Sequence, residues 1–243
     1  MQEMVSLKIK LQDEKYCDNI KKLLLDYRKT WFKENTSEYM WFDDLFSKAN
    51  VIENTSEQHM SYDLFENMHS VLFSYIAKRF AGCDFVGTIE YCNDDGYPPV
   101  SKKYEFCDGI LYSKGMKAVV CCSNLHSENY RIPEKSTKIE SSAFSGNTSI
   151  KELIVPSQIK KISRSVFSFM KVLEEVIIEE GVEKILDNAF ECCYELKRIV
   201  IPTSVISIKK SAFAKCENVV LVVKPGSYAE SFAKENKLAF VLI

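Results

Sequence analysis

A repeat of 23 residues runs through the C-terminal half of the chain, and it limits the possible folds more than any other feature. Four phenylalanines lie on one 23-residue grid and four isoleucines on a second. The grids are Phe144, Phe167, Phe190 and Phe213, and Ile139, Ile162, Ile185 and Ile208. A unit this short cannot bury its own apolar face, so successive units must stack. The period therefore predicts a solenoid, whose extended surface favours binding over catalysis.

Prolines mark the same period. They occur at Pro133, Pro156, Pro202 and Pro225, and Glu179 takes the proline position in the remaining repeat. The apolar, β-branched alternation at 153–155, which recurs in each repeat, predicts one strand per coil and a single parallel sheet. The expected coils are residues 132–154, 155–177, 178–200 and 201–223.

The C-terminal end carries a cap. Ser227 followed by Glu230 is the pattern of a capping box and predicts a short helix, after which 238–243 adds a last strand. Terminal repeats of this kind cover the apolar core that a bare solenoid end would expose.

The first part of the chain has a different pattern. Residues 5–11 alternate apolar and polar side chains, as in a half-buried strand, and Asp13 precedes an amphipathic helix. The aromatic-rich segment 30–46 is expected to hold an irregular helix and part of the core, and 61–82 a further helix. Alternation from Phe85 to Cys122 predicts antiparallel strands. The expected fold is therefore α+β, with a small α+β domain at 1–107 and the solenoid at 108–243.

Composition excludes several functional classes. A net charge of −2 provides no field that would attract nucleic acid. The sequence lacks a run of about 20 apolar residues, so no membrane span is expected. No secretory signal precedes the first strand, which predicts a cytoplasmic location for the chain as written, or the cell surface or secretion if an upstream signal was removed. There is no HExxH, CxxC, P-loop, dinucleotide fingerprint or GxSxG pattern, so neither a metal, a cofactor nor enzyme activity is expected.

Two of the nine cysteines are one repeat apart. Cys193 and Cys216 should therefore lie in adjacent coils, about 4.8 Å from each other along the sheet, which is close enough for a disulfide. The absence of a secretory signal favours buried, reduced thiols instead.

The candidate binding site is the outward face of the predicted sheet. If Leu153 and Val155 point into the core, Ile154 between them must point outward, because side chains alternate along a strand. The repeat places an apolar ladder on that face, flanked by charged residues, which predicts a protein-binding strip. The ladder is Ile154, Ile177, Val200 and Val223, and its flanking residues are Glu152, Glu175 and Arg198. Two alternatives are that these residues reflect strand propensity alone, or that the N-terminal domain covers them.

Several segments of the repeats carry a family resemblance. They are 132–133, 138–144, 201–205, 208–213, 224–230 and, before the first coil, 108–114. Over 108–243 the chain resembles the BspA-like leucine-rich repeats. The resemblance implies a leucine-rich-repeat solenoid, and most such proteins are bacterial surface or secreted binding proteins. Residues 1–107 resemble no family.

Three functions are compatible with these observations. The favoured one is a non-catalytic module that binds a partner protein through the exposed sheet face of the solenoid. The second is a secreted or cell-surface adhesin for host matrix or glycan. The third is a small-molecule sensor or an enzyme with its site in the N-terminal domain.

Overall fold

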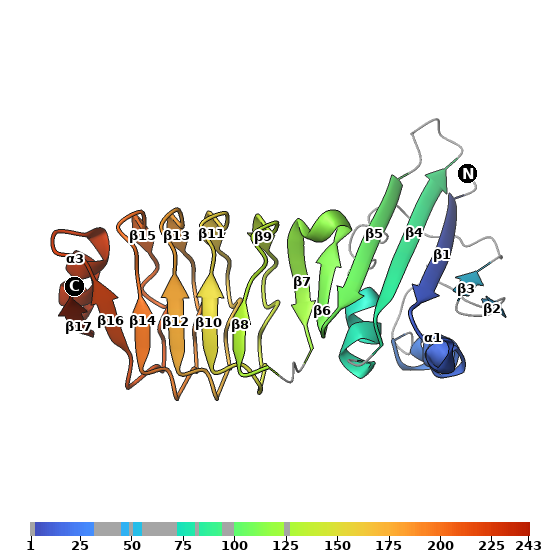
Figure 1. Cartoon of the computed structure of the whole chain (residues 1–243), viewed down its shortest axis with the longest axis horizontal. Helices are drawn as coiled ribbons and strands as arrows, with labels where there is room; N and C mark the ends of the chain where they lie inside the picture. The colour runs from blue at the N-terminus through green and yellow to red at the C-terminus, as the bar shows by residue number, and fades with distance from the viewer. Residues whose placement is uncertain are drawn as a thin grey trace. The chain divides into compact units, whose positions relative to one another are not determined.

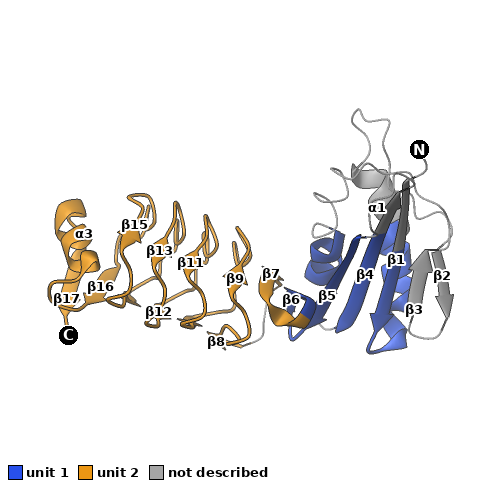
Figure 2. Cartoon of the chain, turned by 90° about the horizontal axis from the view of Figure 1, so that it is seen from above, with its two compact units in different colours: residues 1–114 blue, residues 115–243 orange. Residues whose placement is uncertain are grey.

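The computed structural model describes residues 3–31, 45–48, 51–54, 72–80, 83–93, 100–123 and 127–243. The chain divides into two units, residues 1–114 and residues 115–243 (Figure 2). The first unit is α+β and the second is the solenoid, in agreement with the expected fold class.

The first unit is built on an antiparallel sheet with the strand order β2-β3-β1-β4-β5-β6. The alternation predicted near the N-terminus is confirmed, because Leu7, Ile9 and Leu11 are buried while Lys8 and Lys10 are exposed. The strands are β1 (Glu3–Leu11), β2 (Leu45–Lys48), β3 (Val51–Asn54), β4 (Phe85–Asn93), β5 (Val100–Cys107) and β6 (Ile110–Ser113).

Helices contribute the rest of this core. A 3-10 turn, η1 (Glu14–Tyr16), leads into α1 (Cys17–Trp31). Asp13 caps η1, because its carboxylate accepts a hydrogen bond from the Lys15 N–H at 3.0 Å. A second helix covers 72–79. Its Phe73 ring packs directly over Gly87 of β4, where a Cβ atom would lie 2.0 Å from the ring. Glycine is therefore required at this position by close packing.

Part of the expected helical structure lies outside the described residues. This applies to residues 61–71 and to most of the aromatic segment 30–46. Where the structure does describe that segment, Trp31 ends α1 and Leu45 begins the strand β2, a strand that the sequence pattern did not predict.

The second unit is a stack of coils whose main sheet has the order β8-β10-β12-β14-β16-β17 (Figure 1). Every neighbouring pair in it is parallel, which confirms the predicted sheet. Its strands are β8 (Asn129–Arg131), β10 (Glu152–Val155), β12 (Glu175–Ile178), β14 (Arg198–Val200), β16 (Val220–Val223) and β17 (Ala239–Leu242).

Each central coil also contributes a second strand of two residues, whereas the sequence pattern predicted only one strand per coil. These strands, β11 (Lys161–Ile162), β13 (Lys184–Ile185) and β15 (Ser207–Ile208), form a parallel sheet of their own. Upstream of them, β9 (Lys138–Ile139) pairs in parallel with β7 (Ala118–Cys122). The isoleucine of each short strand is buried, so the second predicted grid lines the core.

The phenylalanine grid forms a continuous aromatic stack inside the coils. Phe167 and Phe190 are fully buried, and their ring centroids are 5.3 Å apart. Phe144 lies 5.3 Å from Phe167, and Phe213 lies 5.6 Å from Phe190. The stack continues to Tyr130 at one end and Phe232 at the other.

The C-terminal cap has the predicted form. Helix α3 (Tyr228–Asn236) begins at Ser227, whose hydroxyl accepts a hydrogen bond from the Glu230 N–H, while the Glu230 carboxylate accepts one from the Gly226 N–H. Phe232 and Ala233 are buried, and β17 follows as the outermost strand of the sheet.

The aromatic stack predicts the cost of removing one ring. Replacing Phe190 with alanine should lower the free energy of unfolding by about 3–5 kcal/mol, because the cavity would lie between two coils that both depend on the ring. Denaturant titration of the purified chain measures this loss. Phe169→Ala is the matched control: its ring is exposed, so the expected change is within about 0.5 kcal/mol. A loss below about 1 kcal/mol at Phe190 would show that the stack is not part of the stabilising core.

Candidate functional site

The outward face of the main sheet carries two rows of side chains that run across the strands. Strand pairing places Arg131 beside Ile154, Ile154 beside Ile177 and Ile177 beside Val200. A second row joins Asn129, Glu152, Glu175 and Arg198 in the same way. The face therefore has an apolar row beside a charged row.

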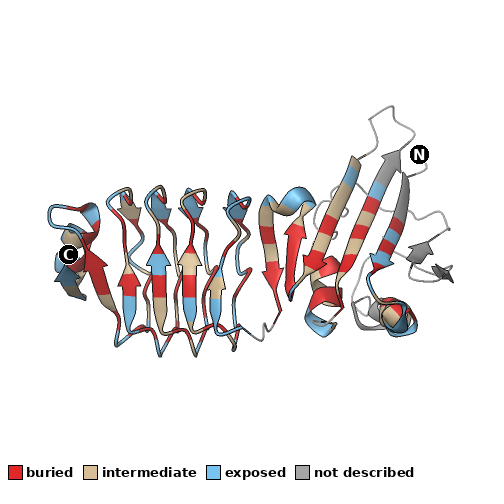
Figure 3. Cartoon of the chain, in the orientation of Figure 1, coloured by how far each residue is buried: buried red, intermediate tan, exposed pale blue. Residues whose placement is uncertain are grey.

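Burial agrees with this alternation (Figure 3). In β10, Leu153 and Val155 are buried while Ile154 between them is half-buried. In β12, Ile177 is 36% exposed, a high value for a large apolar side chain in the middle of a sheet. The outward positions predicted for Ile154, Ile177 and Val200 are thus confirmed, whereas their role in binding stays a prediction.

The expected outward position of Val223 is wrong. Val223 is 0% exposed, and the residue paired with Val200 is Val222. The physical reason is the register between the strands β14 and β16. Arg198 pairs with Val220, so paired residues of these two strands are 22 residues apart in the sequence instead of 23. This shift turns Val223 into the core. Val222 is itself only 2% exposed, so the accessible apolar row ends at Val200 and resumes at Val241 of β17.

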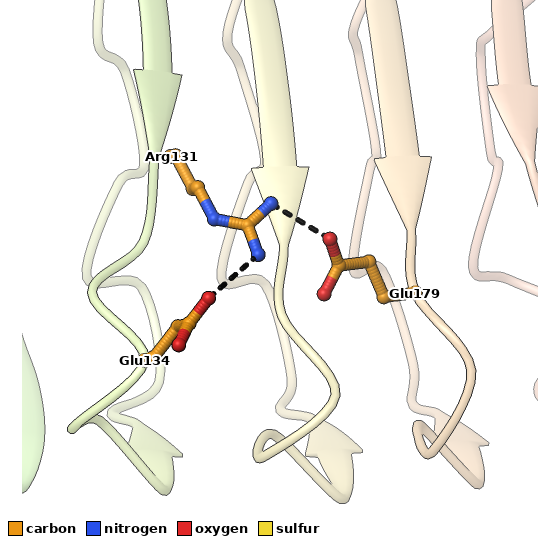
Figure 4. A network of polar contacts seen from close by, with 3 residues as sticks. All are labelled: Arg131, Glu134 and Glu179. Carbon is orange, nitrogen blue, oxygen red and sulfur yellow. Dashed lines mark hydrogen bonds and ion pairs between the residues drawn. The ribbon is translucent and has the colours of Figure 1, made fainter.

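Arg131 connects its own coil to the second coil further on, at one edge of the apolar row. Figure 4 shows its side chain reaching from β8 past β10 to Glu179, the residue after β12. The Nη1–Oε1 distance to Glu179 is 2.7 Å, and Nη2 lies 3.2 Å from Oε1 of Glu134. Glu179 is the residue that replaces proline in the repeat, and its backbone N–H, which proline would lack, donates to the Val155 carbonyl. The break in the proline grid was visible in the sequence, but Arg131 was missed as its partner.

These contacts change the proton affinity of both groups. The hydrogen bond from Arg131 holds the pKa of Glu179 below its ordinary value, and the same bond raises the pKa of Arg131. The pair is therefore ionised at neutral pH, and the guanidinium is fixed beside the apolar row.

The opposite edge of the row is lined by further ion pairs between adjacent coils. Arg198 pairs with Glu175 across neighbouring strands. Lys151 lies 2.8 Å from Glu128, and Lys197 lies 2.6 Å from Glu174, each pair 23 residues apart. Glu152 is exposed and forms no ion pair with the described part of the chain.

A shallow hollow of about 250 Å³ opens on this face. Arg131 and the two glutamates contribute charged groups to its lining, and the isoleucines contribute apolar ones. The outward residues that line it are Asn129, Arg131, Glu152, Ile154, Glu175 and Ile177. Cavities that bind small molecules are commonly about 300–1,000 Å³. The hollow is therefore smaller than most cavities of that kind.

The two cysteines of adjacent coils are free, buried thiols. The Cys193 thiol donates to the Phe167 carbonyl at 3.1 Å, and the Cys216 thiol donates to the Phe190 carbonyl at 2.9 Å. A hydrogen bond with Cys216 and burial raise the pKa of Cys193. Both residues thus join one coil to the preceding one through the carbonyl group of a stacked phenylalanine.

The described residues contain neither a candidate metal cluster nor a candidate membrane-spanning helix. No group of three or more histidine, cysteine, aspartate or glutamate side chains is arranged to hold a metal ion there. None of the described helices is long and apolar enough to cross a membrane.

Parallel coils with one main strand each, a buried aromatic stack and a capped end define a leucine-rich-repeat solenoid. Residues 117–236 match the family described as BspA type Leucine rich repeat region, in six copies. The repeat half of this chain belongs to that family. Solenoids of this class are generally non-catalytic, and the match supports an interaction or adhesin-like role without identifying a partner.

Several solved structures of bacterial proteins are similar to part of the chain. A leucine rich cell surface protein from Faecalibacterium prausnitzii is 26% identical with a TM-score of 0.44, covering 53% of this chain and 41% of its own. A leucine-rich repeat protein from Bacteroides ovatus is 22% identical with a TM-score of 0.38, covering 61% and 41%. The pneumococcal vaccine antigen PcpA is 16% identical with a TM-score of 0.34, covering 58% and 47%. This chain therefore spans less than half the length of each, and no curated protein matches it.

The Arg131–Glu179 pair predicts a measurable pKa change. Replacing Arg131 with methionine should raise the pKa of Glu179 toward its ordinary value of 4.5, because the cationic donor is lost. Carboxyl-carbon NMR titration measures this pKa in both proteins. Because the folded pKa is depressed, the stability from this pair is present above the unfolded pKa and is lost as the pH falls through the folded one.

Lys197→Met provides the matched control for this titration. It should raise the pKa of Glu174, which Lys197 lowers, and leave Glu179 unchanged. An unchanged Glu179 titration in the Arg131→Met protein would contradict the assigned pairing.

Proposed function

We propose that the chain is a non-catalytic protein-interaction module that binds its partner through the outward face of the β8-to-β14 sheet. The observation that carries this proposal is the register of Ile154, Ile177 and Val200, three apolar side chains aligned on an otherwise polar, solvent-facing surface. Isolated exposed apolar residues need no explanation, but a contiguous row with polar edges is typical of an interaction surface.

Charged groups on both sides of the row support the same role. Arg131 is fixed by two glutamates on one side, and Arg198 by Glu175 on the other. A partner that covers the row would meet charges already held in place by contacts between coils. Such an arrangement favours orientation and specificity over raw affinity.

The proposal predicts the effect of charging the row. Replacing Ile177 and Val200 together with lysine should leave the solenoid folded, because neither side chain contributes to the buried columns, and should weaken partner binding at least about tenfold. The measurement is quantitative capture from an extract of the source organism on the immobilised full chain, followed by titration of each recovered protein. Circular dichroism and thermal unfolding establish that the variant is folded.

Ile206→Lys serves as the matched control. Ile206 is 61% exposed and lies just before β15, away from the main sheet, so its replacement should change neither folding nor binding. A folded double variant that binds every recovered protein at full strength would show that the row reflects strand propensity alone. Unfolding of the double variant would show that the outward assignment is wrong.

A further inference from the structure

The shape of the proposed face restricts the kind of partner segment it fits. β10 and β12 are four residues long, about 13 Å, and the four strands of the face, β8 to β14, span about 14 Å from the first to the last at about 4.8 Å per interval. The apolar row runs across these strands, perpendicular to their direction. A segment that contacts Ile154, Ile177 and Val200 at once must therefore lie across the strands.

The spacing within the row distinguishes a helix from an extended segment. The step from Ile154 to Val200 crosses two strand intervals, about 9.6 Å. Two turns of an α-helix advance about 10.8 Å, so side chains at i, i+3 or i+4, and i+7 nearly match three successive positions. In an extended strand the same-face residues i and i+4 are about 13 Å apart and fall out of step. The row thus matches a helix.

Charge adds a second restriction. Among the groups that border the row there are six carboxylates and four cations, namely Glu128, Glu134, Glu152, Glu174, Glu175 and Glu179 against Arg131, Lys151, Lys197 and Arg198. The excess is acidic, and Glu152 forms no ion pair within the described residues. A basic side chain of the partner next to its apolar stripe would complete this pairing.

The hollow adds a third restriction. Its volume of about 250 Å³ and its isoleucine surface suit one large apolar side chain, placed between Arg131 and Glu152. Interfaces commonly depend on a single anchor of this kind at their centre.

We propose that the partner presents an amphipathic α-helix across the strands, with apolar residues at i, i+3 or i+4, and i+7, one large anchor side chain in the hollow, and a lysine or arginine beside Glu152. This inference rests on the function proposed above and specifies its ligand. The helix lies over Ile154, Ile177 and Val200, and its basic residue lies on the edge of the face that Glu152 occupies.

A display library of random peptides tests this directly. Peptides of about 16 residues, about 24 Å when helical, are selected on the immobilised full chain and counter-selected on the Ile177→Lys, Val200→Lys double variant, which removes peptides that bind elsewhere. The expected survivors have apolar residues with helical spacing and are enriched in lysine and arginine. A mid-peptide proline should abolish their binding, because it breaks a helix.

Charge reversal tests the basic contact by fluorescence polarisation with one surviving peptide. Glu152→Lys should weaken binding about threefold to tenfold, and changing the peptide's basic residue to glutamate should recover it. Ile206→Lys, the control away from the sheet, should bind the peptide normally.

The outcomes separate this inference from the function on which it rests. Survivors with i, i+2 alternation or proline-rich spacing, or with acidic enrichment, overturn the helix proposal, as does the absence of any survivor. The wider function is decided by whether capture of the natural partner depends on Ile177 and Val200. A captured partner that requires both residues but contacts them through an extended segment would retain the function and remove the helix.

Discussion

Contact between successive coils is the interaction on which the second unit depends. No coil encloses a core of its own, since each phenylalanine of the grid completes its packing only against the rings above and below. The thiols of Cys193 and Cys216 add hydrogen bonds to the carbonyl groups of Phe167 and Phe190. At the first coil Asn147 occupies the same column, donating to the Ser123 carbonyl and accepting from the Ser149 and Ile150 N–H groups. Stability in such a stack is a sum of contacts between neighbouring coils.

The side chains that point inward keep the coils stacked in register. The side chains that point outward are therefore less constrained by the fold. Glu179 illustrates this freedom. Four repeats have proline at its position, and here a glutamate provides both a backbone donor to Val155 and a carboxylate for Arg131 two coils away. One departure from the repeat thereby fixes a cation beside the apolar row without disturbing any inward column. Departures on the outward rows are thus where a solenoid of this type acquires a specific surface.

The sequence predicted the periodic features well because they share one period. The parallel sheet, the phenylalanine stack and the outward positions of Ile154, Ile177 and Val200 follow from the 23-residue step and from strand alternation, and the local pattern of Ser227 and Glu230 predicted the capping box. Prediction from the sequence failed where the strand pairing departs from this period or where no repeat is present. The 22-residue step into β16 turned Val223 inward, and no periodic pattern marks the one-residue difference. The contact between Arg131 and Glu179 joins residues 48 apart, and strand β2 lies in an aromatic segment with no repeat to interpret.

The shifted register of β16 also sets the length of the candidate face. With 23 residues throughout, Val223 would have followed Val200 outward and extended the apolar row by another strand. Instead Val222 takes that position and is almost fully covered, so the accessible row stops after Ile154, Ile177 and Val200. These three residues span two strand intervals, which is about the length of two turns of an α-helix. A contact of this length is the shortest that distinguishes a helix from an extended chain. A one-residue shift in the pairing of β16 with β14, and not a change in the type of amino acid in the row, thus limits the length of the exposed apolar row.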